Sequence, residues 1–303
     1  MIEQITALLL DSRNPDGGWG SAKGKRTNTE ATSLAIMALK SLEHKSNVQY
    51  TRDAIAWLAH HQNGDGSWPL NDASNQSSWT TPLAMLALLP FPDQVERALS
   101  GAKWIMTQEG RKPGWLASLW VRLSPAHKIV DLDPFLSGWS WTDGAFSWVE
   151  PTSYCLIALK KVKSLLGGTN VEERIRQGKM LIYDRMCDDG GWNYGNPKVF
   201  GDNLWPYPDI TAVALIALHD HAQNRANQQS LRALDMMMRE VVSGLALSWG
   251  IICLSIYNQD TWESQKLLAK SFQKTRFLGE TKTLALAILA LANAGRFFES
   301  QRK

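Results

Sequence analysis

A short glycine-rich turn recurs along this chain and sets the limits on its fold. It reads Asp-Gly-Gly-Trp-Gly at 16–20, Gly-Asp-Gly-Ser-Trp at 64–68 and Asp-Gly-Gly-Trp at 189–192. In each copy glycine tolerates a positive φ, aspartate caps the turn through its side chain, and one tryptophan is left to pack elsewhere. Self-similarity of this kind is the signature of a repeat architecture, so a stack of like units is expected.

An almost wholly apolar, alanine-rich segment follows each turn. These segments cover 30–39, 79–88, 150–159, 209–218 and 280–289. A helix that is apolar on every side is buried on every side, and alanine lets such helices approach closely. More amphipathic segments, with one charged face, lie at 52–61, 97–107 and 174–186. The repeating unit is therefore an outer helix, a turn and an inner helix.

Two degenerate units complete the count. One at 103–122 has Gly114-Trp115 in the turn position and fills the long interval between the second and third inner segments. Another at 231–257 has its apolar segment at 245–256. Six outer and six inner helices close into a ring, and no strand-like alternation competes. The sequence thus predicts an all-α, six-fold α/α toroid, a barrel of helical hairpin repeats, as a single domain over 1–303.

Charge and composition exclude several classes of protein. The net charge is +3 with no basic run, so nucleic-acid binding is not expected. The apolar stretches are too short to cross a bilayer, and the start carries Glu3 where a signal peptide has basic residues. Three cysteines cannot form a disulfide framework. We expect a cytoplasmic protein, and the sequence leaves peripheral membrane contact and the oligomeric state open.

Four acidic residues share one register in the inner segments. Glu30, Glu150, Asp209 and Glu280 each precede a segment-final leucine by nine residues. Inner helices of a toroid run parallel, so these acids are expected to ring the mouth of one central cavity. Helix capping and dipole compensation are the alternative role, since acids are favoured at helix N-termini. In a dry pocket the acids repel one another, and one stays protonated near neutral pH.

Tryptophan is unusually abundant, with 14 residues against 8 Phe and 6 Tyr. Trp19, Trp68 and Trp192 belong to the turns and are expected to pack between repeats. Other aromatic side chains gather near the acids, where an aromatic face stabilises a cation by about 0.5–2 kcal/mol. We expect the cavity-lining and substrate-binding set to be Trp79, Trp139, Trp141, Trp148, Tyr154, Trp205, Tyr207 and Trp249.

The turn and its inner helix resemble the repeat of squalene and oxidosqualene cyclases, which prenyltransferase β subunits share. Gln62-Asn-Gly-Asp-Gly-Ser-Trp68 is similar to the QW motif of the cyclases. Tyr207-Pro-Asp-Ile-Thr-Ala-Val213 resembles the segment around their protonating aspartate, which reads Asp-Cys-Thr-Ala in oxidosqualene cyclases. Squalene–hopene cyclases carry two more acids there, and Tyr207 and Ile210 stand in those places in this chain.

The resemblance implies a terpene-cyclase-like enzyme, an isomerase or lyase, that cyclises or isomerises a small apolar isoprenoid or polyene. In such an enzyme Asp209 donates the proton and Glu150 assists, while Glu30 and Glu280 are further cavity acids. No cofactor and no metal is expected, because Ser153 stands where prenyltransferase β subunits carry an aspartate that binds zinc.

Two other functions fit the same residues. An acid/base hydrolase or lyase acting on a sugar would use two of the ring acids. A non-catalytic lipid-binding or scaffold toroid would use none of them. A closed aromatic pocket favours the cyclase, an open polar groove favours the sugar enzyme, and a filled barrel centre favours the scaffold.

Overall fold

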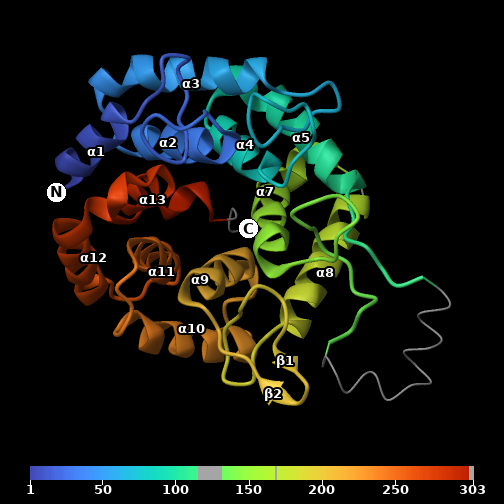
Figure 1. Ribbon diagram of the computed structural model, residues 1–303. Coiled ribbons are helices and arrows are strands. Elements are labelled where there is room, and N and C mark those ends of the chain that lie inside the picture. Colours follow the sequence, from blue (N-terminus) through green and yellow to red (C-terminus); the bar gives the residue numbers. More distant parts are fainter. Residues whose placement is uncertain (115–131, 168, 300–303) are drawn as a thin grey trace.

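The computed structural model describes residues 1–114, 132–167 and 169–299. Twelve α-helices in this part of the chain alternate between an outer and an inner position (Figure 1). The outer helices are α1 (Ile2–Asp11), α3 (Val48–His60), α5 (Val95–Thr107), α8 (Thr169–Asp184), α10 (Arg225–Met238) and α12 (Trp262–Thr275). The inner helices are α2 (Thr29–Ser41), α4 (Thr81–Leu88), α7 (Val149–Leu166), α9 (Pro208–Ala217), α11 (Gly244–Ile256) and α13 (Thr281–Leu291).

The inner helices form a closed ring. Each one packs against the next in chain order, and α13 returns to pack against α2 (Figure 1). Each outer helix covers the inner helix that precedes it around the ring, so that α3 covers α2 and α1 covers α13. Strands in the described residues form one small antiparallel ribbon of β1 (Lys198–Val199) and β2 (Asp202–Asn203). The predicted all-α, six-fold toroid is confirmed.

Burial explains which helices lie inside. Every residue of α4 is buried, and so is every residue of α9 from Ile210 onward. The outer helix α5 instead buries one stripe at three- and four-residue spacing, made of Ala98, Gly101, Ala102 and Ile105. Apolar helices are thus completely surrounded, and amphipathic helices face solvent. None of the described helices is both long and apolar enough to cross a bilayer.

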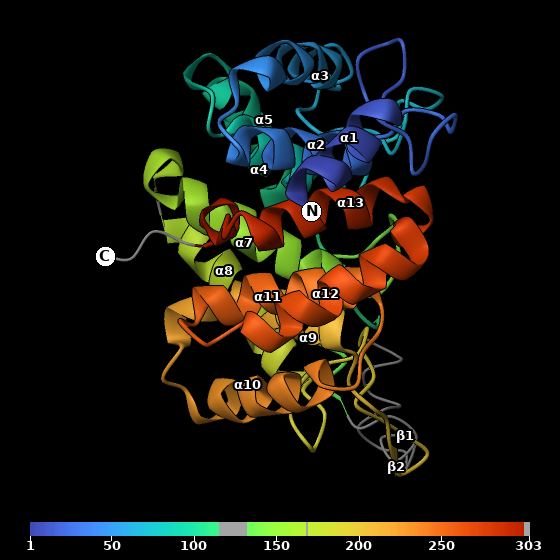
Figure 2. The ribbon, with the colours of Figure 1, turned by 90° about the vertical axis from the view of Figure 1, so that its left-hand side faces the viewer.

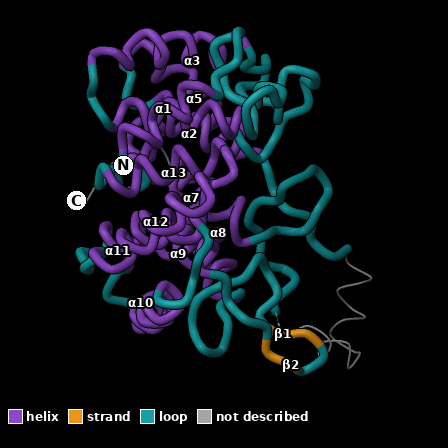
Figure 3. Tube along the Cα trace, turned by 60° about the vertical axis from the view of Figure 1, so that its left-hand side comes forward, coloured by secondary structure: helices purple, strands orange, loops and turns teal. Residues whose placement is uncertain are grey.

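The two ends of the ring differ. The long loops that lead from outer to inner helices gather at one end, which we call the mouth (Figure 3). They include 12–28, 61–80 and 185–207. The inner helices begin there, so their N-termini share the mouth. The segment after α13 lies at the opposite end, close to the ring axis (Figures 1 and 2).

Four turn tryptophans make the same two hydrogen bonds. The backbone N–H of each donates at 2.9–3.0 Å to the hydroxyl of a threonine in the first turn of the inner helix. The indole Nε1–H donates at 2.6–2.9 Å to a carbonyl near the end of the preceding outer helix. The pairs are Trp19–Thr32, Trp68–Thr81, Trp139–Thr152 and Trp192–Thr211. Trp19, Trp68 and Trp192 are fully buried at the junction of two helices of their own unit, and Trp68 also lies against Gly101 of α5 in the next unit, as the predicted packing between repeats requires.

Trp139 belongs to this set, which corrects the expectation that it serves as a cation-stabilising residue of the central cavity. Its indole donates to the Ile105 carbonyl of α5 at 2.9 Å, away from the ring axis. The residue before it must be glycine, because a Cβ at Gly138 would lie 2.3 Å from the Thr152 hydroxyl oxygen. Thirteen residues separate Trp139 from Thr152, as they do in the first two units. That spacing was present in the sequence and identifies the turn.

The described residues of the degenerate unit predicted at 103–122 do not form a separate unit. The first of these residues, up to Thr107, are the end of α5. The stretch 115–122, with the predicted turn residue Trp115, lies outside the described residues. The third unit therefore runs from α5 to α7, with its turn at Trp139. The unit predicted at 231–257 is confirmed, with α11 as its inner helix.

Trp139→Ala is expected to lower the free energy of unfolding by about 3–5 kcal/mol, the usual cost of removing a large buried aromatic side chain. Trp205→Ala is the matched control, because Trp205 is 77% exposed and surface substitutions usually change stability by less than about 0.5 kcal/mol. Urea unfolding followed by circular dichroism measures both. Equal losses in the two variants would contradict a structural role for Trp139.

Candidate active site

Three inner helices begin at an equivalent hydrogen bond. The backbone N–H of the first helical residue donates to the carbonyl that lies two residues after the turn tryptophan of the next unit around the ring. The bonds are Thr29 to Leu70 at 3.0 Å, Val149 to Tyr194 at 2.9 Å and Thr281 to Ser21 at 2.9 Å. The third bond joins the last unit to the first and so closes the ring. Residues that follow these donors occupy equivalent places at the mouth.

The second residues of these three helices are Glu30, Glu150 and Lys282, and Asp209 is likewise the second residue of α9. The sequence register had placed Glu280 in this set. The structure corrects that placement, because Glu280 precedes α13 and its carboxylate accepts a hydrogen bond from the Thr283 hydroxyl of its own helix. Lys282 was missed because the register was counted back from Leu289, the last residue of the apolar segment. A count from the first residue of the helix places Lys282 with the acids.

The mouth side chains meet in one cluster. Lys282 Nζ lies 2.8 Å from Glu30 Oε1 and 3.7 Å from Glu150 Oε1. Glu30 comes from the neighbouring helix α2, whereas Glu150 comes from α7 across the ring (Figure 1). The Tyr154 hydroxyl donates to Glu150 Oε1 at 3.3 Å. The side chains of Glu30, Glu150 and Lys282 keep 13–22% of their surface exposed, so the cluster is largely buried but open to the mouth.

Burial changes the acidity of two members. It raises the pKa of Glu150; the Lys282 ammonium opposes this, whereas the charges of Glu30 and Asp209 add to it. Burial also raises the pKa of Asp209, against the backbone N–H groups of Asp209 and Ile210, which favour the carboxylate. Two acids thus hold their protons to higher pH than free side chains do, beside a third acid that is paired with an ammonium. This is an arrangement for general acid–base chemistry.

A stack of aromatic rings fills the ring centre beneath the acids. Trp79, at the start of the α4 unit, stacks on Tyr154 with centroids 6.2 Å apart, and Tyr154 contacts Trp249 of α11 at 6.0 Å. Trp249 meets Phe298, from the segment after α13, edge to face at 5.0 Å. Tyr154 and Trp249 are only 1% and 2% exposed. They therefore pack against other rings in this structure and leave almost no surface for a ligand.

A second row of rings lies at the mouth. Trp148 stacks on Trp141 at 5.2 Å, Trp141 contacts Tyr194 at 5.7 Å, and Tyr194 contacts Tyr207 at 5.7 Å. Burial raises the pKa of the Tyr194 hydroxyl, and the nearby charges of Asp209 and Glu150 add to this, so the row borders the acids. Tyr194 was missed in the sequence because it follows a turn tryptophan and precedes no acid. Trp205, at 77% exposed, lies on the surface instead of in a cavity, which corrects its expected role.

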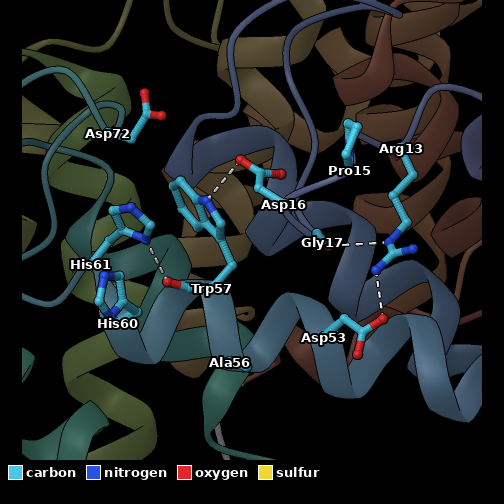
Figure 4. A pocket seen from close by; sticks show the side chains of 10 residues that line it. All are labelled: Arg13, Pro15, Asp16, Gly17, Asp53, Ala56, Trp57, His60, His61 and Asp72. Atoms are coloured by element: carbon cyan, nitrogen blue, oxygen red, sulfur yellow. Dashed lines mark hydrogen bonds and ion pairs between the residues drawn. The ribbon is translucent and has the colours of Figure 1, made fainter.

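A separate groove of about 540 Å³ lies on the outside of the ring, between the first two units (Figure 4). Its polar side chains already bond one another: Arg13 pairs with Asp53 at 2.6 Å, and the Trp57 indole donates to Asp16 at 3.2 Å. His61 Nδ1 lies 2.8 Å from the carbonyl oxygen of Trp57. None of the mouth acids lines this groove. We therefore place the candidate active site at the mouth.

Comparison with known proteins identifies the fold. No protein-family model matches the chain. The type II terpene cyclase MstE from Scytonema is similar with a TM-score of 0.59 and 15% identity, over 98% of this chain and 97% of that chain. A variant of MstE has been solved in complex with its substrate, geranylgeranyl dihydroxybenzoate.

Two carbohydrate-active proteins are similar to a comparable degree. An alpha-amylase from Clostridium perfringens has a TM-score of 0.61 and 10% identity, over 97% of this chain and 98% of that chain. An inactive alpha-1,6-mannanase variant of Salegentibacter, in complex with alpha-1,6-mannotriose, has a TM-score of 0.60 and 8% identity, over 98% of each chain. At such identities the likeness concerns the toroid fold, which carries more than one chemistry.

Glu150→Gln is expected to stabilise the protein at neutral pH. Because burial raises the pKa of Glu150 above 4.5, its ordinary value, the folded chain binds this proton more tightly than the unfolded chain does. Stability from this residue is present at low pH and is lost as the pH rises from the unfolded pKa through the folded pKa. Glutamine does not ionise and can still accept the Tyr154 hydrogen bond.

Urea midpoints measured at about pH 4 and about pH 8 test this linkage. The fall in stability between the two should be smaller in Glu150→Gln than in the wild type. Glu43→Gln is the control, because Glu43 lies on the surface with 69% of its side chain exposed. Parallel pH dependence in the wild type and Glu150→Gln would show that Glu150 titrates normally.

Proposed function

We propose that this protein is a terpene-cyclase-like enzyme that uses acid to start the cyclisation or isomerisation of an isoprenoid or similar polyene. One observation carries the proposal: Asp209 and Glu150, both with pKa values raised by burial, lie at one mouth beside a row of aromatic rings. A neutral carboxylic acid next to aromatic faces is what protonation of a carbon–carbon double bond requires.

In the proposed reaction Asp209 gives its proton to one carbon of a terminal double bond. The π electron pair forms the new C–H bond, and the adjacent carbon becomes a cation. Further double bonds of the chain attack this cation and close rings. Loss of a proton from the last cation restores a neutral product. Glu150, as carboxylate, accepts that proton and can return it to Asp209 for the next turnover.

The aromatic row at the mouth stabilises the cation. The row runs Trp148, Trp141, Tyr194 and Tyr207, with the centroids of consecutive rings 5.2–5.7 Å apart. An aromatic face contributes about 0.5–2 kcal/mol to a nearby cation. Sugars also stack their C–H faces on aromatic rings, so the substrate panel described below, and not the row alone, separates the cyclase from an acid/base enzyme that acts on carbohydrate.

The filled ring centre is the feature expected of a non-catalytic scaffold, so the expected central cavity is absent from the described residues and the proposal rests on the acids at the mouth. Because Tyr154 and Trp249 are packed against other rings, a substrate reaches the acids from the mouth and not from within the ring. The acids remain partly exposed there. The apolar substrate then lies across the mouth, with its terminal double bond at Asp209.

Asp209→Asn is expected to fold like the wild type and to lose activity by about 10²–10⁴-fold, the usual weight of general acid catalysis. Asparagine keeps the shape of the side chain, and its amide oxygen can still accept from the backbone N–H groups of Asp209 and Ile210. Turnover is measured with a panel of linear polyprenyl substrates and mass detection of products, and a melting curve is recorded for each variant. Asp235→Asn on the outer helix α10 is the matched control.

Alpha-1,6-mannotriose is included as a carbohydrate substrate. Hydrolysis of this sugar, without any change in the polyprenyl substrates, would replace the cyclase by a sugar enzyme. Full polyprenyl activity in Asp209→Asn would remove Asp209 as the donor and leave Glu150 as the proton source. No reaction with any substrate would favour a non-catalytic toroid.

A further inference from the structure

The second residue of an inner helix is an acid in α2, α7 and α9, and it is a lysine in α13. Glu30, Glu150, Asp209 and Lys282 are each the second residue of their helix. We infer that Lys282 is a positioning residue that keeps Glu150 able to ionise and thereby selects Asp209 as the acid that carries the proton. This role rests on the proposed function, because it concerns which acid of the same site carries the proton.

The geometry places the ammonium between two acids from different helices. Lys282 Nζ is 2.8 Å from Glu30 Oε1, which makes a direct ion pair, and 3.7 Å from Glu150 Oε1. The pair with Glu30 holds Lys282 against the neighbouring helix and aims its charge at Glu150 across the ring. Burial opposes the charge of Lys282, but Tyr154, Glu30 and Glu150 outweigh it and raise the pKa of Lys282 above its ordinary value. The lysine therefore stays charged at any physiological pH.

Glu150 has charged or titratable groups on several sides. Tyr154 of its own helix donates a hydrogen bond to it, and Lys282 of α13 attracts its proton-free form. Glu30 of α2 and Asp209 of α9 disfavour that form, as burial does. Tyr194, on the loop that borders the acids, is a further titratable group near it. Among these named groups Lys282 is the only cation, so it alone supplies a positive charge that supports ionisation of Glu150.

Ionisation of Glu150 opposes ionisation of Asp209, since the charges of the two acids interact. The Lys282 charge also lowers the pKa of Asp209, but Lys282 makes its ion pairs with Glu30 and Glu150. Two carboxyl groups that share a site do not both ionise easily, so a charge on one favours the neutral form of the other. An ionised Glu150 therefore leaves the proton on Asp209, where the proposed reaction needs it. Without Lys282, Glu150 holds its own proton to higher pH and becomes a poorer acceptor for the final proton.

The test measures the titration of individual carboxyl groups in the whole protein without any substrate. Protein labelled with ¹³C at the glutamate side-chain carboxyl is titrated by NMR, and the Glu150 signal is assigned by its loss in Glu150→Gln. In Lys282→Met the titration midpoint of Glu150 should rise by about 1–3 pH units, the usual effect of removing an opposite charge at this distance. Lys282→Arg should return most of this shift.

A variant on the other side of the ion pair separates charge from structural damage. Glu30→Gln removes a negative charge and leaves Lys282 free for Glu150, so the Glu150 midpoint should fall below that of the wild type. Lys266→Met is the control for loss of a surface lysine, because Lys266 forms an ion pair with Glu263 of its own helix α12, away from the mouth. It should leave the Glu150 midpoint unchanged.

Opposite shifts in Lys282→Met and Glu30→Gln support the inference, since a loosened structure would move both midpoints in the same direction. An unchanged Glu150 midpoint in Lys282→Met, or shifts of the same sign, would overturn it. If Lys282→Met does not fold, Lys282→Arg and Glu30→Gln still decide, because the first must stay near the wild type and the second must fall. Absence of polyprenyl turnover with opposite shifts would reject the enzyme but keep the role of Lys282.

Discussion

The hydrogen bond between the turn tryptophan and the threonine of the inner helix is the contact on which this ring depends. The backbone N–H of the tryptophan bonds the helix, and its indole N–H bonds the preceding outer helix, so one residue holds three parts of a unit together. Both bonds are buried, and a buried polar group without a partner costs about 1–3 kcal/mol. Each turn therefore has one favoured position relative to its helices, although the bonded threonine is the fourth residue of α2, α7 and α9 and the first residue of α4.

Most of the fold could be predicted from the sequence because the burial of each helix is visible in the pattern of its apolar residues. Apolar residues on every face mark the inner helices, and a single apolar stripe marks the outer ones. Trp139 was assigned wrongly because a large apolar ring looks the same in a list whether it packs between helices or lines a cavity. Its partner Thr152, thirteen residues on, carries the distinction, since the pair repeats the geometry of Trp19 and Thr32.

The site could be predicted only in part, for a related reason. Glu150 and Asp209 come from different inner helices, and the charges of Asp209 and Glu30 both raise the pKa of Glu150, so the three acids are near one another. Glu280 was misplaced because its distance from Leu289, the last residue of its apolar segment, equals that of the other acids, whereas the direction of a side chain depends on its position relative to the start of the helix. That helix starts at Thr281, whose N–H bonds Ser21. A hydrogen bond between units far apart in the chain cannot be recognised from the sequence around either residue.

The same backbone bond explains how the mouth can hold different chemistry at equivalent positions. It uses an N–H and a carbonyl, so the residue that follows is free to be Glu in α2, Glu in α7 or Lys in α13 without any change in the ring. A buried charge is costly unless it is paired, and the lysine of α13 lies where two acids meet it. Since α13 also closes the ring against α2, closure of the fold and charge balance of the site depend on one helix.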